Sequence, residues 1–301
     1  MQKGSLNQFP NEPATVGIAE SSNIEDAVRT AVELCGGFDF IKPGQKVMIK
    51  PNVNTGDSPP FSTNVEVVKA VAGLVLERHP SKLLIGEKSM TARKTLVEMK
   101  KAGFLELGLN LQVDVVPFDD APWVKVKPKN GKAWPEGFSV PSIVFDMDHI
   151  ISVPVVKTHW TATFSIALKN QVSFISDYDR GFLPHGVRGN DTLFADLIAE
   201  ISLAVKHVFV VTDATKCLVA GRGSAGRICS PGLIFATLDI VANDVVGLSL
   251  LKHLGTEPKV QDMSVRGQPQ IRSAVELGLG TDKVLLRGHV NEIGDIRRQM
   301  A

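Results

Sequence analysis

The stretch "KVMIKPNVNTGDSPPFSTNVEVVKAVAGLVLERHPSKLLIGEKS", residues 46–89, predicts the basic unit of the fold. It begins and ends with short apolar runs rich in Val, Ile and Leu, as buried strands are. Between these runs, residues 63–78 place Val67, Val71 and Val75 on one face of a helix. A strand, a helix and a strand of these lengths predict a βαβ unit, in which the two strands run parallel.

The same alternation continues on both sides of this unit. Further strands are predicted at residues 15–19, 111–120, 149–156, 207–214 and 232–239, and further helices at 23–37, 93–107, 192–206 and 240–255. Strands separated by helices of this length favour a three-layer α/β protein, with a mainly parallel sheet and helices on both faces.

Residues 120–145 interrupt the alternation. Within them, "VKVKPKNGKAWP" alternates apolar and charged residues around Asn130 and Gly131, a pair typical of hairpin turns. We therefore predict an antiparallel insertion near residues 122–144. It belongs to one α/β domain that spans residues 1–301, and we do not expect it to form a domain of its own.

Composition excludes several classes of protein. The chain is 44% hydrophobic and 22% charged, with a formal net charge of +1, so no charge excess points to nucleic acid or to a membrane surface. No apolar run reaches the ~18 residues of a membrane span, and the N-terminus lacks the pattern of a signal peptide. We expect a cytoplasmic protein without nucleic-acid or membrane partners, and a homodimer remains open.

The cysteines and glycines argue against common cofactors. Cys35, Cys217 and Cys229 are widely spaced and form no CxxC motif, so they predict neither a zinc site, an iron–sulfur site nor a disulfide framework. The sequence "GRGSAG" (221–226) has the spacing of a dinucleotide motif, but Pro231 and a strand follow it where a helix would be required. We expect no redox cofactor, and the glycines form either a loop near a ligand or a tight connection.

Polar side chains follow several predicted strands. In parallel sheets, ligands bind where strands end at their carboxyl edge. The residues at these ends are Lys50 and Asn52, Glu87 and Lys88, Lys157, Thr158 and His159, and Asp213. Their convergence predicts a cleft lined by lysine and histidine.

The lysines have two alternative interpretations beyond simple solvent exposure. Lys50 and Lys157 follow runs that are too apolar for a surface edge. Burial beside a like charge would lower the pKa of a lysine and make it a base near neutral pH. Several lysines around one cleft could instead hold a phosphate or a carboxylate. His159, His185 and Asp213 could contribute to an open metal site, but no local spacing supports it, and we expect no metal.

Several motifs occur together in one order. "MIKPNVN" (48–54), "LLIGEKS" (83–89) and "DHIISVPVVKTHWTATFSIALKN" (148–170) resemble the family catalogued as domain of unknown function 362 over roughly residues 40–255. The resemblance implies that the family's motif positions are occupied by Lys50, Asn52, Lys157, His159, Lys169, Asn170 and His185. It implies no reaction. Many relatives carry a ferredoxin-like CxxCxxC segment, which this sequence lacks.

These observations lead to one main functional hypothesis. We expect an enzyme that acts on a carboxylate- or phosphate-bearing small molecule by cofactor-independent acid/base chemistry: an isomerase, lyase or cyclase. Lys157, His159 and Lys50 are assigned to catalysis, with Lys157 or His159 as base or acid. Substrate binding is assigned to Asn52, Thr158, Lys169, Asn170, His185, Glu87, Lys88 and Asp213. The alternatives are a non-catalytic ligand-binding or cofactor-maturation protein and a metal-dependent enzyme.

Overall fold

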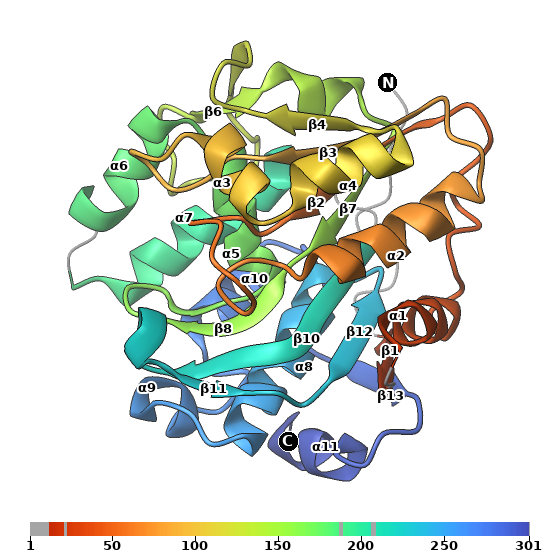
Figure 1. Ribbon diagram of the computed structural model, residues 1–301. Helices are drawn as coiled ribbons and strands as arrows, with labels where there is room; N and C mark the ends of the chain where they lie inside the picture. Colours follow the sequence, from red (N-terminus) through yellow and green to blue (C-terminus); the bar gives the residue numbers. More distant parts are fainter. Residues whose placement is uncertain (1–11, 21–22, 187–188, 206–208, 301) are drawn as a thin grey trace.

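The central sheet contains eleven strands in the computed structural model, which describes residues 12–20, 23–186, 189–205 and 209–300 (Figure 1). Eight of them lie side by side in the order β13-β1-β12-β10-β7-β2-β3-β4, and β8, β9 and β11 extend from β10. The strands are β1 (Ala14–Glu20), β2 (Lys46–Pro51), β3 (Lys82–Glu87), β4 (Asp114–Pro117), β7 (His149–Val153), β8 (Val155–His159), β9 (Thr163–Ser165), β10 (Phe209–Ala220), β11 (Arg227–Cys229), β12 (Leu233–Thr237) and β13 (Val284–Arg287).

The strand directions confirm the predicted fold class. β10, β7, β2, β3 and β4 form a continuous parallel block, as the βαβ pattern of residues 46–89 predicts. β12 is antiparallel to both of its neighbours, β1 and β10, and β13 adds a parallel edge. The sheet is therefore mainly parallel, and its antiparallel pairs are those of β12 with its two neighbours, β10 with β11, and β8 with β9.

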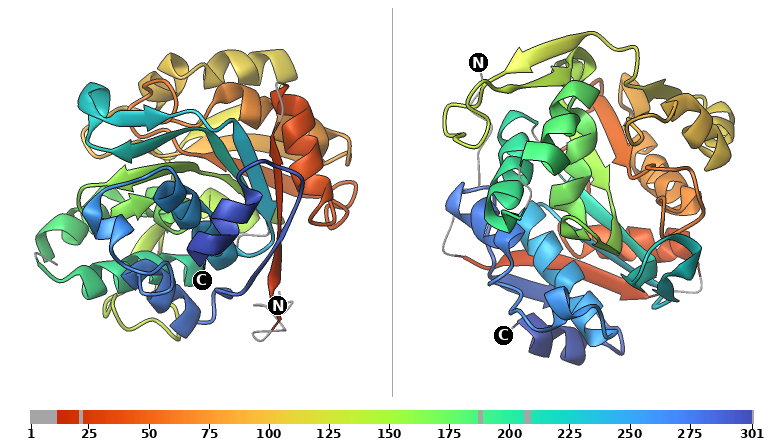
Figure 2. Two further views of the ribbon diagram at one scale, coloured as in Figure 1. Left: turned by 90° about the horizontal axis from the view of Figure 1, so that it is seen from below. Right: turned by 90° about the vertical axis from the view of Figure 1, so that its left-hand side faces the viewer.

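Helices cover both faces of the sheet, and Figure 2 shows the three layers in its left-hand view. The helices are α1 (Ile24–Glu33), α2 (Val65–Leu76), α3 (Thr95–Lys101), α4 (Phe104–Leu111), α5 (Ala167–Asn170), α6 (Asp177–Gly186), α7 (Asp191–Ala204), α8 (Ile240–His253), α9 (Pro258–Gln261), α10 (Pro269–Glu276) and α11 (Ile293–Met300). Alternate residues of β2 enter different cores: Val47 and Ile49 pack with α1 and α2, whereas Met48 packs on the opposite face with α7 and α8. This division follows from the two-residue period of a strand.

The strand predicted at residues 149–156 is two strands. β7 pairs with β2 as far as Val153, opposite Pro51, and Pro154 then ends that pairing. β8 continues along β10 and forms a hairpin with β9, but it does not pair with β2. Proline lacks the N–H that a central strand needs, which explains the break. A space therefore opens between the end of β2 and β8.

The insertion is antiparallel, as predicted, but its turn differs from the prediction. β5 (Trp123–Val126) pairs with β6 (Phe138–Pro141) in a separate two-stranded sheet, and residues 127–137 connect them. Asn130 and Gly131 therefore do not form a two-residue hairpin turn. The carboxylate of Glu200, on α7, instead accepts hydrogen bonds from three successive backbone amides of this connection, at residues 132–134.

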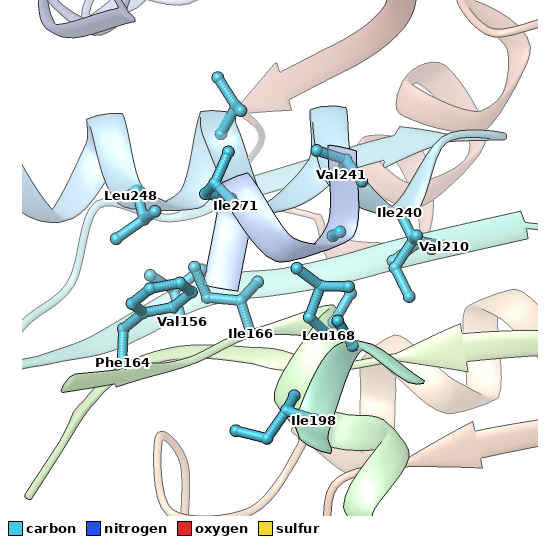
Figure 3. Close-up of a cluster of buried hydrophobic side chains, with 14 of the residues drawn as sticks. Val156, Phe164, Ile166, Leu168, Ile198, Val210, Ile240, Val241, Leu248 and Ile271 are labelled. Atoms are coloured by element: carbon cyan, nitrogen blue, oxygen red, sulfur yellow. The ribbon is translucent and has the colours of Figure 1, made fainter. Parts of the chain in front are cut away.

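The core beneath α5 fixes the short helix that follows β9. Ile166 and Leu168 are fully buried among side chains of α7, α8 and α10 (Figure 3). Asp244, on α8, accepts hydrogen bonds from the amides of Ala167 (2.8 Å) and Leu168 (3.0 Å), two of the donors that a helix start leaves without partners. Packing and capping together hold α5 in one position, and its last two residues are Lys169 and Asn170.

Candidate functional site

A cavity of about 80 Å³ lies at the carboxyl ends of β2, β3 and β8, where ligands of parallel sheets bind. At roughly 10–15 Å³ for each water-sized group, it holds a ligand of only about five to eight non-hydrogen atoms. The lining residues are Asn52, Val53, Asn54, Glu87, Lys88, Lys157, His159, Ser165, Lys169, Asn170, Val172, Ser173 and Arg180. Most are polar, and five can carry a positive charge.

Lys50 lies beneath the cavity and is fully buried. Its ammonium donates to Glu87 Oε2 (2.9 Å), to the Pro51 carbonyl (2.7 Å) and to Asn170 Oδ1 (3.2 Å). Burial lowers the pKa of Lys50 to about 8, against the opposing effect of the Glu87 carboxylate. Three acceptors for three protons make Lys50 a fixed cation, which also holds Asn170 in place.

Two asparagines connect Lys50 with Lys157. The Lys157 ammonium donates to Asn52 Oδ1 (2.7 Å) and to the Phe61 carbonyl (3.0 Å), and Asn52 Nδ2 donates to Asn170 Oδ1 (3.3 Å). These side chains bridge the space between β2 and β8 where no backbone ladder exists. Burial, together with the charge of Lys50, lowers the pKa of Lys157 to about 8.

His159 is held as a neutral imidazole. Its Nδ1 atom lies 3.3 Å from the amide nitrogen of Thr161 and 3.1 Å from that of Ala162, and it accepts from both. Nδ1 therefore carries no proton, and the proton of the neutral ring resides on Nε2. Burial and the nearby charges of Lys169 and Lys157 lower the pKa of His159 well below its usual range. Such a ring is a hydrogen-bond donor near neutral pH and a poor base.

Lys169 differs from the other lysines of the cavity. Its side chain is half-buried and lines the cavity, yet within the described ranges its amine has neither a hydrogen-bond partner nor an ion pair. Burial, and then the charges of Arg180, Lys157 and Lys50, lowers the pKa of Lys169 to about 7. The neutral amine of Lys169 is therefore accessible near neutral pH.

Arg180 closes one side of the cavity and was missed by sequence reasoning. Its guanidinium donates to the carbonyls of Val172 (3.1 Å) and Lys88 (3.0 Å) and to that of Ser89. Lys88 in turn pairs with Asp177 at 2.9 Å. "SDYDRG" is typical of a turn, but these contacts attach it as the first part of helix α6 to the end of β3.

Two residues of the predicted set, Thr158 and Asp213, lie outside the cavity lining, and the structure does not describe the side chain of a third, His185. Thr158 is buried and does not line the cavity, because it points to the side of β8 opposite Lys157 and His159. The Asp213 carboxylate lies outside the lining and accepts from the Asn64 amide (2.7 Å) and the Thr215 hydroxyl (2.6 Å). His185 belongs to α6, but its side chain lies outside the described residues.

Metal ligands do not gather around the cavity. No group of three His, Cys, Asp or Glu side chains suited to a metal ion occurs in the part of the chain that the structure describes. The cysteine thiols of Cys35, Cys217 and Cys229 are free, in line with the expectation of no disulfide. The expected absence of a metal and of cofactors stays a prediction.

The chain matches one known protein family over most of its length. A family model described as "Domain of unknown function (DUF362)" matches residues 47–249. The chain belongs to the DUF362 family. The DUF362 match contains all the cavity residues, whereas β1, β13 and α9–α11 lie outside it.

Individual relatives of this DUF362 chain are distant. A thylakoid-associated protein of Synechocystis is 26% identical over 245 residues, which cover 77% of this chain and 71% of that protein. The lactate racemase apoprotein of Thermoanaerobacterium thermosaccharolyticum has a TM-score of 0.49 at 12% identity, over 97% of this chain and 87% of that one. A structural-genomics protein of Thermotoga maritima has a TM-score of 0.43 at 15% identity, over 70% and 56%. Likenesses this weak carry no argument about chemistry.

No helix within the described ranges is long and apolar enough to cross a membrane. The word "thylakoid-associated" describes the Synechocystis protein. The cytoplasmic location and the homodimer considered from the sequence stay predictions.

Proposed function

We propose that this DUF362 protein is an enzyme that moves a proton on a small carboxylate- or phosphate-bearing molecule. The observation that carries the proposal is Lys169, an amine without a partner in a small cavity, with a pKa of about 7. A general base works best when its pKa lies near the operating pH, and enzymes reach this value for lysine by burial among like charges.

The remaining cations suit the binding of an anion. Lys157 and Arg180 line the cavity as fixed positive charges, and Glu87, the acid in the lining, is already bound to Lys50. An acid group would receive charge-assisted hydrogen bonds here, which are about twice as strong as neutral ones. The Asn52 side chain adds an orienting amide.

These residues have complementary roles in the proposed reaction. Lys169 Nζ takes a proton from the carbon next to the acid group, and the electron pair left behind moves onto the carboxylate oxygens. His159 Nε2–H and the Lys157 ammonium stabilise this oxyanion, as positioned donors do in a site shielded from water. Returning the proton to another position gives isomerisation, and loss of a neighbouring group gives elimination. The base is therefore Lys169, whereas sequence reasoning favoured Lys157 or His159.

A covalent variant uses the same amine. If the substrate contains a carbonyl carbon, neutral Lys169 attacks it, and loss of water gives a Schiff base. Treatment with borohydride in the presence of short keto acids separates the two mechanisms. A Schiff base leaves a reduced adduct on Lys169 in a mass spectrum, whereas acid/base chemistry leaves the chain unmodified.

The test is hydrogen exchange from solvent. In D₂O, the wild-type protein should exchange carbon-bound hydrogen of at least one compound in a panel of short hydroxy, keto and unsaturated carboxylic acids, measured by proton NMR. Lys169→Met should lower that rate by about 10²–10⁴, the usual effect of losing a general base, while retaining affinity. Lys69→Met, at an exposed lysine of α2, is the matched control and should leave the rate unchanged. Equal rates for the wild type and Lys169→Met would contradict the assignment.

A second function is favoured by one observation. A network of hydrogen bonds joins Lys50, Asn52, Lys157 and Asn170 and holds the two ammonium groups in fixed positions. Such a network suits a ligand-binding or cofactor-maturation protein that holds an anion without converting it. In that case no compound exchanges hydrogen, and Lys157→Met loses affinity for carboxylates in calorimetry.

A further inference from the structure

The turn between β10 and β11 has no role in the proposed reaction, although it contains the "GRGSAG" sequence of residues 221–226. It is a fixed turn. Gly221 (φ +76°) and Gly223 (φ +49°) occupy the left-handed region that favours glycine, and the Gly226 amide donates to the Gly223 carbonyl (3.0 Å). The Gly221 amide donates to Glu257 Oε1 (2.7 Å), which ties the turn to the start of α9. Such anchoring gives the side chain between the two glycines a defined place.

That side chain is Arg222, and it lies on an exposed tryptophan. Its guanidinium carbon is 4.8 Å from the ring centroid of Trp160, which is 63% exposed. Within the described part of the chain, Arg222 has no carboxylate partner. An arginine stacked in this way keeps its edge N–H groups free to bind a planar acid group in a bidentate manner.

Arg222 and Trp160 lie beside the cavity. Trp160 directly follows His159, which lines the cavity. The register of β10 with β8 places Leu218 opposite Lys157, so the turn after β10 lies next to the turn after β8. In Figure 1 the two turns lie on the left of the molecule, on the same side as α6.

We propose that Arg222, seated on Trp160, binds a second acid group of the substrate at the mouth of the cavity, so that the preferred ligands are short dicarboxylates or phosphorylated carboxylates. This inference rests on the proposed function, because it takes the first acid group to be held inside by Lys157 and Arg180. The cavity holds about five to eight non-hydrogen atoms, so a four-carbon diacid fills it and its second acid group lies at the mouth. An apolar end would meet an unpaired arginine there, whereas an acid group would form an ion pair with it.

The experiment compares ligands that differ in the second acid group only. Binding of butyrate and of succinate, both with four carbons, is measured by calorimetry, and 3-phosphonopropionate, in which a phosphonate replaces one carboxylate of succinate, provides the phosphorus analogue. We expect wild type to bind succinate about tenfold more tightly than butyrate. Arg222→Gln should abolish this preference and leave butyrate binding unchanged. Arg272→Gln, at an exposed arginine of α10, is the matched control and should keep the preference.

Each outcome decides between the two proposals. Equal binding of butyrate and succinate by wild type, or a succinate preference that survives Arg222→Gln, would overturn the role of Arg222 while leaving the anion-binding cavity intact. Failure of all three probes to bind would overturn both this inference and the proposed function. Tighter binding of 3-phosphonopropionate than of succinate would assign the mouth to a phosphate group, and the reverse order would assign it to a carboxylate.

Discussion

The two sides of the cavity contain the same kind of side chain in opposite states. On one side, Lys50 of β2 has three acceptors, and Lys157 of β8 has two. On the α5 side, Lys169 has none among the described residues, and the neighbouring His159 is held neutral. All three lysines have a lowered pKa, yet only Lys169 has an amine that is free to accept a proton. Hydrogen-bond partners, more than burial, therefore distinguish Lys169 from the other two lysines, and the proposed reaction depends on this difference.

The largest effect on stability is expected for Lys50, whose ammonium has three hydrogen-bond acceptors. Lys50→Met leaves the carboxylate of Glu87 buried without its cation, and breaking a buried pair in this way costs about 3–5 kcal/mol of unfolding free energy. Lys169→Met removes a cation without a partner and should cost about 1 kcal/mol or less. Urea unfolding of both variants measures the contrast. Glu87→Gln in the Lys50→Met background should recover part of the loss, and comparable losses for the two single variants would refute the distinction.

An intermediate effect concerns Asp244, which caps the start of α5, the helix that contains Lys169. Asp244→Asn weakens the cap on α5 and should cost about 1 kcal/mol. Burial raises the pKa of Asp244 from 3.8 to about 7, in spite of its hydrogen bonds to the Asn243 side chain and to two backbone amides. Since the folded protein keeps a proton that the unfolded chain releases, the contribution of this group to stability is present below about pH 4 and is lost as the pH rises toward 7.

Thermal unfolding of wild type and Asp244→Asn from pH 4 to 7 checks this sign. The stability difference should be largest at pH 4 and should shrink toward pH 7. A difference that grows with pH would mean that the Asp244 carboxylate is ionised in the folded protein throughout this range. Ser249→Ala, at a buried hydroxyl of α8 that donates to the Val245 carbonyl, provides a control without a titrating group.

The smallest expected effect concerns a residue on the far side of β8. The hydroxyl of Thr158 is buried and has no hydrogen-bond partner in the described structure. Thr158→Val replaces it with a methyl group of similar shape, so the free energy of unfolding should be unchanged or higher by up to about 1 kcal/mol. Solvent exchange into the substrate should also be unchanged. A loss of binding would instead support the assignment of Thr158 to the ligand that strand-end position favours.

Much of the fold is predictable because its signals are local. The apolar runs around residues 63–78 determine a βαβ unit without reference to the rest of the chain. The division of residues 149–156 also has a local signal in Pro154, which a central strand excludes. The docking of residues 127–137 does not, because it depends on Glu200, far along the chain.

The candidate site is less predictable, because the contacts that decide it join segments far apart in the sequence. Strand-end position brings Lys50, Asn52 and Lys157 to one place, and the structure joins them through hydrogen bonds. The difference between Lys157 and Lys169 depends on which acceptors come within 3 Å, and these come from distant segments. Arg180 was obscured by acidic neighbours typical of a turn. The sequence pattern thus indicates where cations gather, and tertiary contacts decide what each one can do.

The break at Pro154 has a consequence for how such a site can diverge. β8 pairs with β10 and β9, and β9 pairs with β8, so neither strand belongs to the β2–β7 ladder. Insertions or exchanges in this hairpin leave the parallel block with its own pairing and packing. Changes in this hairpin can therefore replace Lys157 or His159, and with them the specificity of the site, while Lys50 of β2 keeps its ion pair with Glu87 of β3.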